Sequence, residues 1–173
     1  MNKKGFFVFV AVCIVAATVY ANLPVTVVVL RDYAGVEKFS FSSADGRFAV
    51  RFTHSWALSP VDELFQVDAR NNIVLKETVY EDFGAGLPHE PPHSLSSMTI
   101  ENGKVHIRGI DRIISDLQIR TGRSVAAHTL IYRNRYVPFS DFAAPGDVVI
   151  FRAKSVKRYV LWVGEVLSWR IKR

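Results

Sequence analysis

Three successive segments of this chain alternate apolar and polar residues with a period of two, and this pattern restricts the fold more than any other feature. The segments are residues 47–56, 61–67 and 73–80. In the first, Phe48, Val50 and Phe52 fall on one face while Arg51 falls on the other. A period of two is typical of strands with one buried face. We therefore expect the three segments to form a β-meander.

Other short runs of β-branched and apolar residues predict further strands. They are residues 25–30, 37–43, 98–100, 105–108, 117–121, 125–132 and 148–151. Asn102-Gly103 is a hairpin signal, because a type I′ turn needs positive φ at both central positions. A single helical turn is expected over residues 140–143. The whole pattern predicts one all-β domain, a single antiparallel sandwich or a partly open barrel.

The N-terminal residues differ in character from the rest of the chain. Two lysines precede an uncharged apolar run over residues 5–20, and Val19-Tyr20-Ala21 offers a signal peptidase site. We expect residues 1–21 to be a Sec signal peptide, which places the protein in the periplasm or elsewhere outside the cytoplasm. An uncleaved membrane anchor is the alternative, because the run approaches the length of a bilayer span. Residues 22–173 are then expected to form a single β-rich domain.

Charge gathers in a basic, aromatic C-terminal segment, residues 152–173, within a chain of net charge +6. The basic residues of this segment are Arg152, Lys154, Lys157, Arg158, Arg170, Lys172 and Arg173. On an exported protein, such a segment favours contact with a membrane surface over nucleic acid. The alternative is that these charges lie on a solvated surface. Judged from charge alone, this is the simplest interpretation of the segment. Residues 156–167 have both helical and strand spacing.

One histidine and two glutamates fall in phase with the apolar residues of the expected strands. They are His54, Glu63 and Glu77, each two positions from a residue of the buried face. Buried charge is costly unless paired, so we expect His54 to pair with a glutamate. The cluster is either a structural hydrogen-bond network or a binding site. It could also hold a divalent metal, although its spacing matches no metal motif.

The sequence predicts no catalytic residue among its other serine, glycine-loop, histidine and cysteine positions. Ser55 adjoins His54, but adjacent strand residues point to opposite faces, so His54 is not expected to act as its base. The loop Phe83-Gly84-Ala85-Gly86-Leu87-Pro88 lacks the spacing of a nucleotide-binding loop, and we expect a tight turn there. His128 lies in an apolar run and is expected to be a core or rim histidine. Cys13 is the only cysteine, and cleavage after Ala21 would remove it, so we expect no thiolate site in the mature domain. We also expect no cofactor.

The motifs together resemble a bacterial family, the domain of unknown function eighteen-fifty. The first group comprises Thr53-His54-Ser55, Ser59-Pro60-Val61-x-Glu63-x-Phe65, Glu77 and the loop over residues 83–88. The second group comprises Ala127-His128-Thr129-Leu130, Pro138-x-Ser140 and Pro145-Gly146. The resemblance covers residues 46–151 and leaves the C-terminal segment outside it.

The resemblance implies a small exported protein, of a family often encoded beside membrane subunits of TRAP transporters of the TAXI type. It implies a binding or assembly role, with transporter membrane subunits or a solute-binding protein as partners. The resemblance carries over no catalytic residue, because the family has no established activity. Two alternatives come from other classes. One is a periplasmic enzyme or metal-binding protein that uses the His/Glu cluster, and the other is a structural envelope protein.

Overall fold

The computed structural model describes residues 3–81, 87–122 and 127–161 of the chain. The elements are α1 (Lys3–Asn22), β1 (Pro24–Arg31), β2 (Glu37–Ser42), β3 (Arg47–Thr53), β4 (Pro60–Val67), β5 (Ile73–Tyr80), β6 (Ser97–Glu101), β7 (Lys104–Ile114), β8 (Leu117–Arg120), β9 (Thr129–Tyr132), β10 (Arg135–Pro138), η1 (Phe139–Asp141) and β11 (Val148–Lys157). The predicted strands are confirmed, with changed ends. β11 runs on to Lys157, and residues 158–161 are helical. β10 was not predicted.

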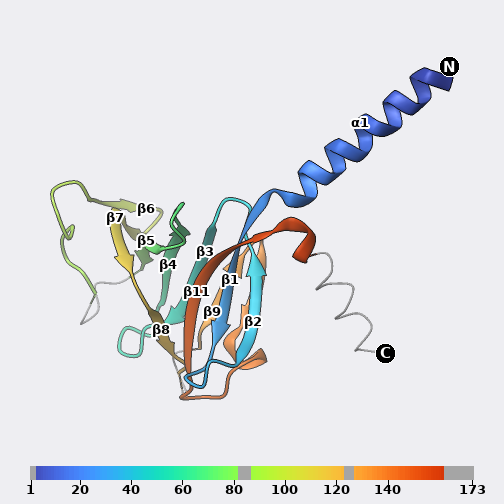
Figure 1. The fold of residues 1–173 in the computed structure, drawn as a ribbon. Coiled ribbons are helices and arrows are strands. Elements are labelled where there is room, and N and C mark those ends of the chain that lie inside the picture. The colour runs from blue at the N-terminus through green and yellow to red at the C-terminus, as the bar shows by residue number, and fades with distance from the viewer. Residues whose placement is uncertain (1–2, 82–86, 123–126, 162–173) are drawn as a thin grey trace. The chain divides into compact units, whose positions relative to one another are not determined.

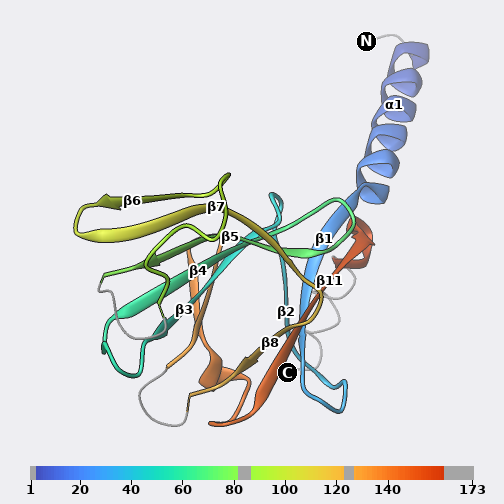
Figure 2. The same cartoon turned by 90° about the vertical axis from the view of Figure 1, so that its left-hand side faces the viewer.

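The strands form two antiparallel sheets that do not close into a barrel. One sheet has the order β2-β1-β11-β8, and the other has the order β10-β9-β3-β4-β5-β7-β6 (Figure 1). The predicted meander is the β3-β4-β5 part of the larger sheet. In Figure 2, β4, β5 and β7 run across the direction of β1 and β11. The all-β prediction is therefore confirmed, and the domain is a sandwich with crossed strands.

α1 is a 20-residue apolar helix with a mean hydropathy of 2.1, and none of its residues is buried. Such a helix is compatible with a signal sequence or an anchor and indicates export. The described residues 3–25 and 155–161 belong to one compact unit, and residues 26–154 form the other.

Phe48 lies at the centre of the main core between the two sheets. Its ring centroid is 5.1 Å from that of Phe65 in the same sheet. It is also 5.6 Å from Phe41 and 5.8 Å from Phe151, both in the opposite sheet. Aromatic rings at these separations prefer particular relative orientations, and such pairs stabilise a fold beyond the burial of their apolar area. Phe48 therefore joins the two sheets.

A second, smaller core lies on the same inner face of the larger sheet. Its buried members are Val61, Tyr80, Leu87, Val105 and Ile107. Leu87 comes from the loop before β6, and the Tyr80 hydroxyl donates a hydrogen bond to the Pro88 carbonyl in that loop. Leu87 and Pro88 thus contact the strands of the larger sheet.

β5 contains a bulge at Lys76 that reverses which side chains face inward. Leu75 pairs with Phe65, whereas Glu77 pairs with Leu64, so Lys76 has no partner on β4. The buried residues accordingly change from Ile73 and Leu75 to Thr78 and Tyr80. One inserted residue moves every later side chain to the opposite face.

The substitution Phe48→Ala should lower the free energy of unfolding by about 3–5 kcal/mol, because it opens a cavity that both sheets line. Tyr136→Ala, at an aromatic residue that is 63% exposed, is the matched control and should change it by less than about 1 kcal/mol. Urea unfolding followed by circular dichroism measures both. Equal effects of the two substitutions would contradict the central position of Phe48.

Candidate functional site

The segments that carry the family resemblance meet at one end of the larger sheet. The end of β3 pairs with the start of β4, where Thr53 lies opposite Pro60. The end of β5 lies beside this position through the pair Val61 and Tyr80. The start of β9 pairs with β3 and with the end of β10. Of the glycine loop, Phe83, Gly84, Ala85 and Gly86 lie outside the described residues.

His54 stabilises the turn between β3 and β4. Its backbone N–H donates to the Ser59 carbonyl at 2.9 Å, and its carbonyl accepts from the Leu58 N–H at 2.9 Å. Its ring Nδ1 accepts a hydrogen bond from the Ala57 N–H at 3.1 Å. The predicted strand therefore ends at Thr53, and Ser55 is exposed within the turn. The contacts of His54 are those of a turn-stabilising residue.

Glu77 does not face the inner layer, which corrects the prediction from strand phase. The bulge at Lys76 turns it to the outer face, where its Oε1 lies 2.7 Å from His106 Nδ1 and 3.1 Å from Arg108 Nε. Arg108 also pairs with Glu101 at 2.6 Å. This ion pair and the hydrogen bonds from Arg108 and Thr99 lower the pKa of Glu101 to about 2. The four residues Glu77, His106, Arg108 and Glu101 form an outer-face ladder of ion pairs and hydrogen bonds.

Glu63 faces the inner layer, as its phase predicts, and lies between the two apolar cores. Val61 of the smaller core and Phe65 of the larger core flank it on β4. Burial raises the pKa of Glu63, and the charge of Arg112 opposes this effect. Its register partner on β3 is Val50, four residues before His54. At about 3.3 Å per residue, this separation is roughly 13 Å, too far for the expected pairing with His54.

His128 is half-buried, and its ring lies between two phenylalanines. Its centroid is 5.6 Å from Phe52 and 5.4 Å from Phe139. Its Nδ1 accepts a hydrogen bond from the Gly122 N–H at 3.4 Å. A cavity of about 340 Å³ adjoins it, with Thr121 and Ser140 among the lining residues. These contacts are those of a rim histidine at the motif-bearing end of the sheet.

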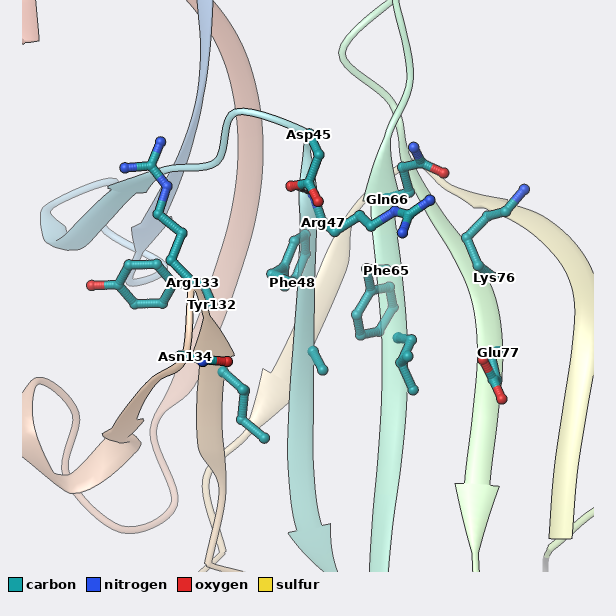
Figure 3. A pocket seen from close by; sticks show the side chains of 13 residues that line it. Asp45, Arg47, Phe48, Phe65, Gln66, Lys76, Glu77, Tyr132, Arg133 and Asn134 are labelled. Carbon is teal, nitrogen blue, oxygen red and sulfur yellow. Dashed lines mark hydrogen bonds between the residues drawn. The ribbon is translucent and has the colours of Figure 1, made fainter. Parts of the chain in front are cut away.

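A larger groove of about 520 Å³ lies on the outer face of the larger sheet (Figure 3). Ala49, Leu64 and Ile131 are register neighbours on β3, β4 and β9 and provide its apolar part. Its polar lining residues are Asp45, Arg47, Gln66, Lys76, Glu77, Arg133 and Asn134. Figure 3 shows Arg47 reaching across β4 toward Gln66, with Arg133 on the other side of Asp45.

Most charged side chains of this outer-face groove already have hydrogen-bond or ion-pair partners within the protein. The Asp45 carboxylate accepts hydrogen bonds from the Ser43 hydroxyl at 2.7 Å and from the Arg47 backbone N–H at 3.1 Å. Glu77 is engaged in the ladder, and Lys76 is paired with Asp111. Within the described part of the chain, the guanidinium groups of Arg47 and Arg133 make no hydrogen bond or ion pair. The groove therefore combines an apolar centre with two available cationic groups.

The described residues contain no group of three or more His, Cys, Asp and Glu side chains that could hold a metal ion. His106, Arg108 and the groove arginines are not among the site residues that the sequence predicts. The alternation of β7 does place His106 and Arg108 on one face. Their contact with Glu77 could not be foreseen, because it depends on the bulge in β5.

The two glutamates should respond in opposite directions when neutralised. At pH 7, Glu63→Gln should raise the melting temperature, because it removes an ionised carboxylate from a buried position. The folded protein binds the proton of the Glu63 carboxyl group more tightly than the unfolded chain does. The stability of the wild-type protein therefore falls as pH rises above about 4.5, and the gain in melting temperature of Glu63→Gln should shrink at pH 3.5.

Glu77→Gln should instead lower the free energy of unfolding by about 1–3 kcal/mol at pH 7, because it removes the partner of His106 and Arg108. Thermal melts of both variants and the wild-type protein at pH 7 and pH 3.5 measure these changes. A loss of stability in Glu63→Gln would contradict this account of the carboxyl group.

The substitution His54→Ala should lower the free energy of unfolding by about 0.5–1.5 kcal/mol, because it removes the hydrogen bond that His54 Nδ1 accepts from the Ala57 N–H. Its effect should add to that of Glu63→Gln within about 0.5 kcal/mol, because the two side chains are well separated. A double-mutant cycle in urea measures this coupling. A coupling energy above about 1 kcal/mol would restore the predicted pairing of His54 with Glu63.

Comparison with known proteins identifies a family but no individual relative. No curated protein and no solved structure matches the chain. Residues 48–139 match the family described as "Domain of unknown function (DUF1850)". The matched region covers 92 of 173 residues. It contains β3 from its second residue and β4 to β10, with His54, Glu63, Glu77 and His128. The chain therefore belongs to this family of unknown function, DUF1850.

Proposed function

We propose that this protein is an accessory, extracytoplasmic component of a TRAP-type solute uptake system of the TAXI class. Its role is binding or assembly, and its partners are the transporter membrane subunits or the solute-binding protein. Support comes from the resemblance of its motifs to a family that accompanies such transporters. The apolar helix α1 is consistent with a location outside the cytoplasm.

The outer-face groove is the observation that favours a binding role. Its lining joins apolar side chains from three strands to the available guanidinium groups of Arg47 and Arg133. Guanidinium groups bind carboxylates through two parallel hydrogen bonds and are frequent at protein interfaces. The groove is therefore suited to an acidic segment of a partner that also carries an apolar residue.

A protein partner fits this groove better than a free solute. The groove lies on the outer face of one sheet and not between the two sheets. Small-molecule sites usually bury roughly 70–90% of the ligand surface, which a site on one sheet face does not do. A protein partner can cover the whole face and exclude water around the arginines.

Deletion of the protein should impair uptake of the solute of its transporter, and the tagged protein should co-purify with transporter subunits. The double substitution Arg47→Gln and Arg133→Gln should reduce co-purification at least tenfold, because hydrogen bonds to charged groups contribute about 1.5–3 kcal/mol each. Radiolabelled uptake and quantitative mass spectrometry provide the two measurements.

Arg135→Gln is the matched control for the groove. Arg135 is an exposed arginine of the same hairpin. Its register partner Tyr132 stacks on Phe41 on the inner side, so Arg135 lies on the face of the sheet opposite the groove. This control should co-purify normally. Normal uptake without the protein, together with no co-purification, would refute the transporter role. Normal co-purification of the double variant would exclude the groove while leaving the transporter role in place.

A further inference from the structure

α1 is long enough to cross a bilayer, and none of its residues is buried against the described part of the protein. The helix has 20 residues, which corresponds to about 30 Å, and it carries no buried residue. Its two polar side chains near the C-terminal end bond within the helix. The Thr18 hydroxyl donates to the Ile14 carbonyl at 2.8 Å, and the Asn22 amide donates to the Thr18 carbonyl at 2.9 Å. Such internal satisfaction suits a helix in hydrocarbon, where no water is available.

The C-terminal end of α1 is held by Arg158, which follows directly after β11. The Arg158 backbone N–H donates to the Leu23 carbonyl at 3.0 Å. Its guanidinium carbon lies 4.1 Å from the centroid of the Tyr20 ring. Tyrosine and arginine are typical of the membrane–water interface, where an aromatic ring and an extended cationic side chain reach the headgroups.

These contacts lie on both sides of the expected cleavage site. The bond between Ala21 and Asn22 belongs to the last turn of α1, and β1 begins at Pro24. Tyr20 precedes this bond and Leu23 follows it, and Arg158 contacts both. Proteolysis is favoured in exposed, irregular segments, and a helical bond must first unwind. Cleavage after Ala21 would also remove the contact between Tyr20 and Arg158.

We infer that α1 remains on the mature protein as a membrane anchor, and that residues 155–161 clasp its end at the lipid headgroups. Lys3 and Lys4 then lie at the cytoplasmic end, in accord with the positive-inside rule. At the other end, Lys157 and Arg158 offer positive charge, while Tyr159 and Val160 are 44% and 45% exposed. This combination of basic, aromatic and aliphatic side chains fits an anionic phospholipid surface. The inference is independent of the transporter role.

The mass of the mature protein tests retention of the anchor. The full chain with a C-terminal tag is expressed in a Sec-competent bacterium, and the cells are separated into membrane and soluble fractions. The intact mass of the tagged protein in each fraction is then measured by mass spectrometry. We expect a membrane protein, resistant to carbonate extraction, that retains residues 3–21. A soluble periplasmic protein beginning at Asn22 would overturn the inference.

Substitutions at Tyr20 and Arg158 test the clasp. Arg158→Gln and Tyr20→Leu should each raise the fraction of chain cut after Ala21 at least threefold, because they release the end of α1. Tyr20→Phe keeps the ring and should stay uncut, as should the control Arg135→Gln. Unchanged cleavage in Arg158→Gln and Tyr20→Leu would overturn the clasp.

Hydrogen exchange in lipid nanodiscs tests the headgroup contact. Amides of residues 155–161 should exchange several-fold more slowly in nanodiscs containing phosphatidylglycerol than in pure phosphatidylcholine. Lys157→Gln combined with Arg158→Gln should abolish this difference, whereas Arg135→Gln should preserve it. Equal exchange of the wild-type segment in the two lipids would overturn the contact with anionic lipid.

Discussion

Phe48 packs against aromatic rings of both sheets, and this contact fixes how the two sheets face each other. Its ring lies among Phe41, Phe65 and Phe151, which come from β2, β4 and β11. Because β2 and β11 belong to the smaller sheet and β3 and β4 to the larger one, these rings meet only when both sheets have formed. Burial of the inner layer in this way leaves the outer face of the larger sheet free for polar side chains. The outer-face groove and the ladder of Glu77 and its partners both lie on that face.

The bulge at Lys76 separates two glutamates that the sequence places in one layer. Glu63 stays between the apolar cores, where burial raises its pKa. Glu77 turns outward to His106 and Arg108. An extra residue in a strand thus replaces the expected buried cluster by one carboxyl group in the inner layer and one ion-pair network on the outer face.

Much of the family pattern has a structural explanation at the end of the larger sheet. His54 closes the turn between β3 and β4, Tyr80 bonds to Pro88, and the ring of His128 lies between Phe52 and Phe139. These contacts hold neighbouring strands in register. The outer-face groove, by contrast, takes its charged residues other than Glu77 from outside those motifs. The residues that carry the family pattern therefore coincide only in part with those of the groove that we propose as a binding site.

The sequence by itself determined the strands, because a period of two reports burial on one face within a single segment. It also determined the turn at Asn102-Gly103, where both residues have positive φ, and the apolar N-terminal helix. The hairpin at Arg133-Asn134 has the same positive φ values but was missed, because arginine is not a residue that signals this conformation. Only the tertiary structure decided the face of Glu77, the groove and the contact of Arg158 with Tyr20. The physical reason is that strand phase is lost at a bulge, and a bulge is set by pairing with both neighbouring strands. Contacts between residues more than a hundred positions apart likewise leave no trace in a local pattern.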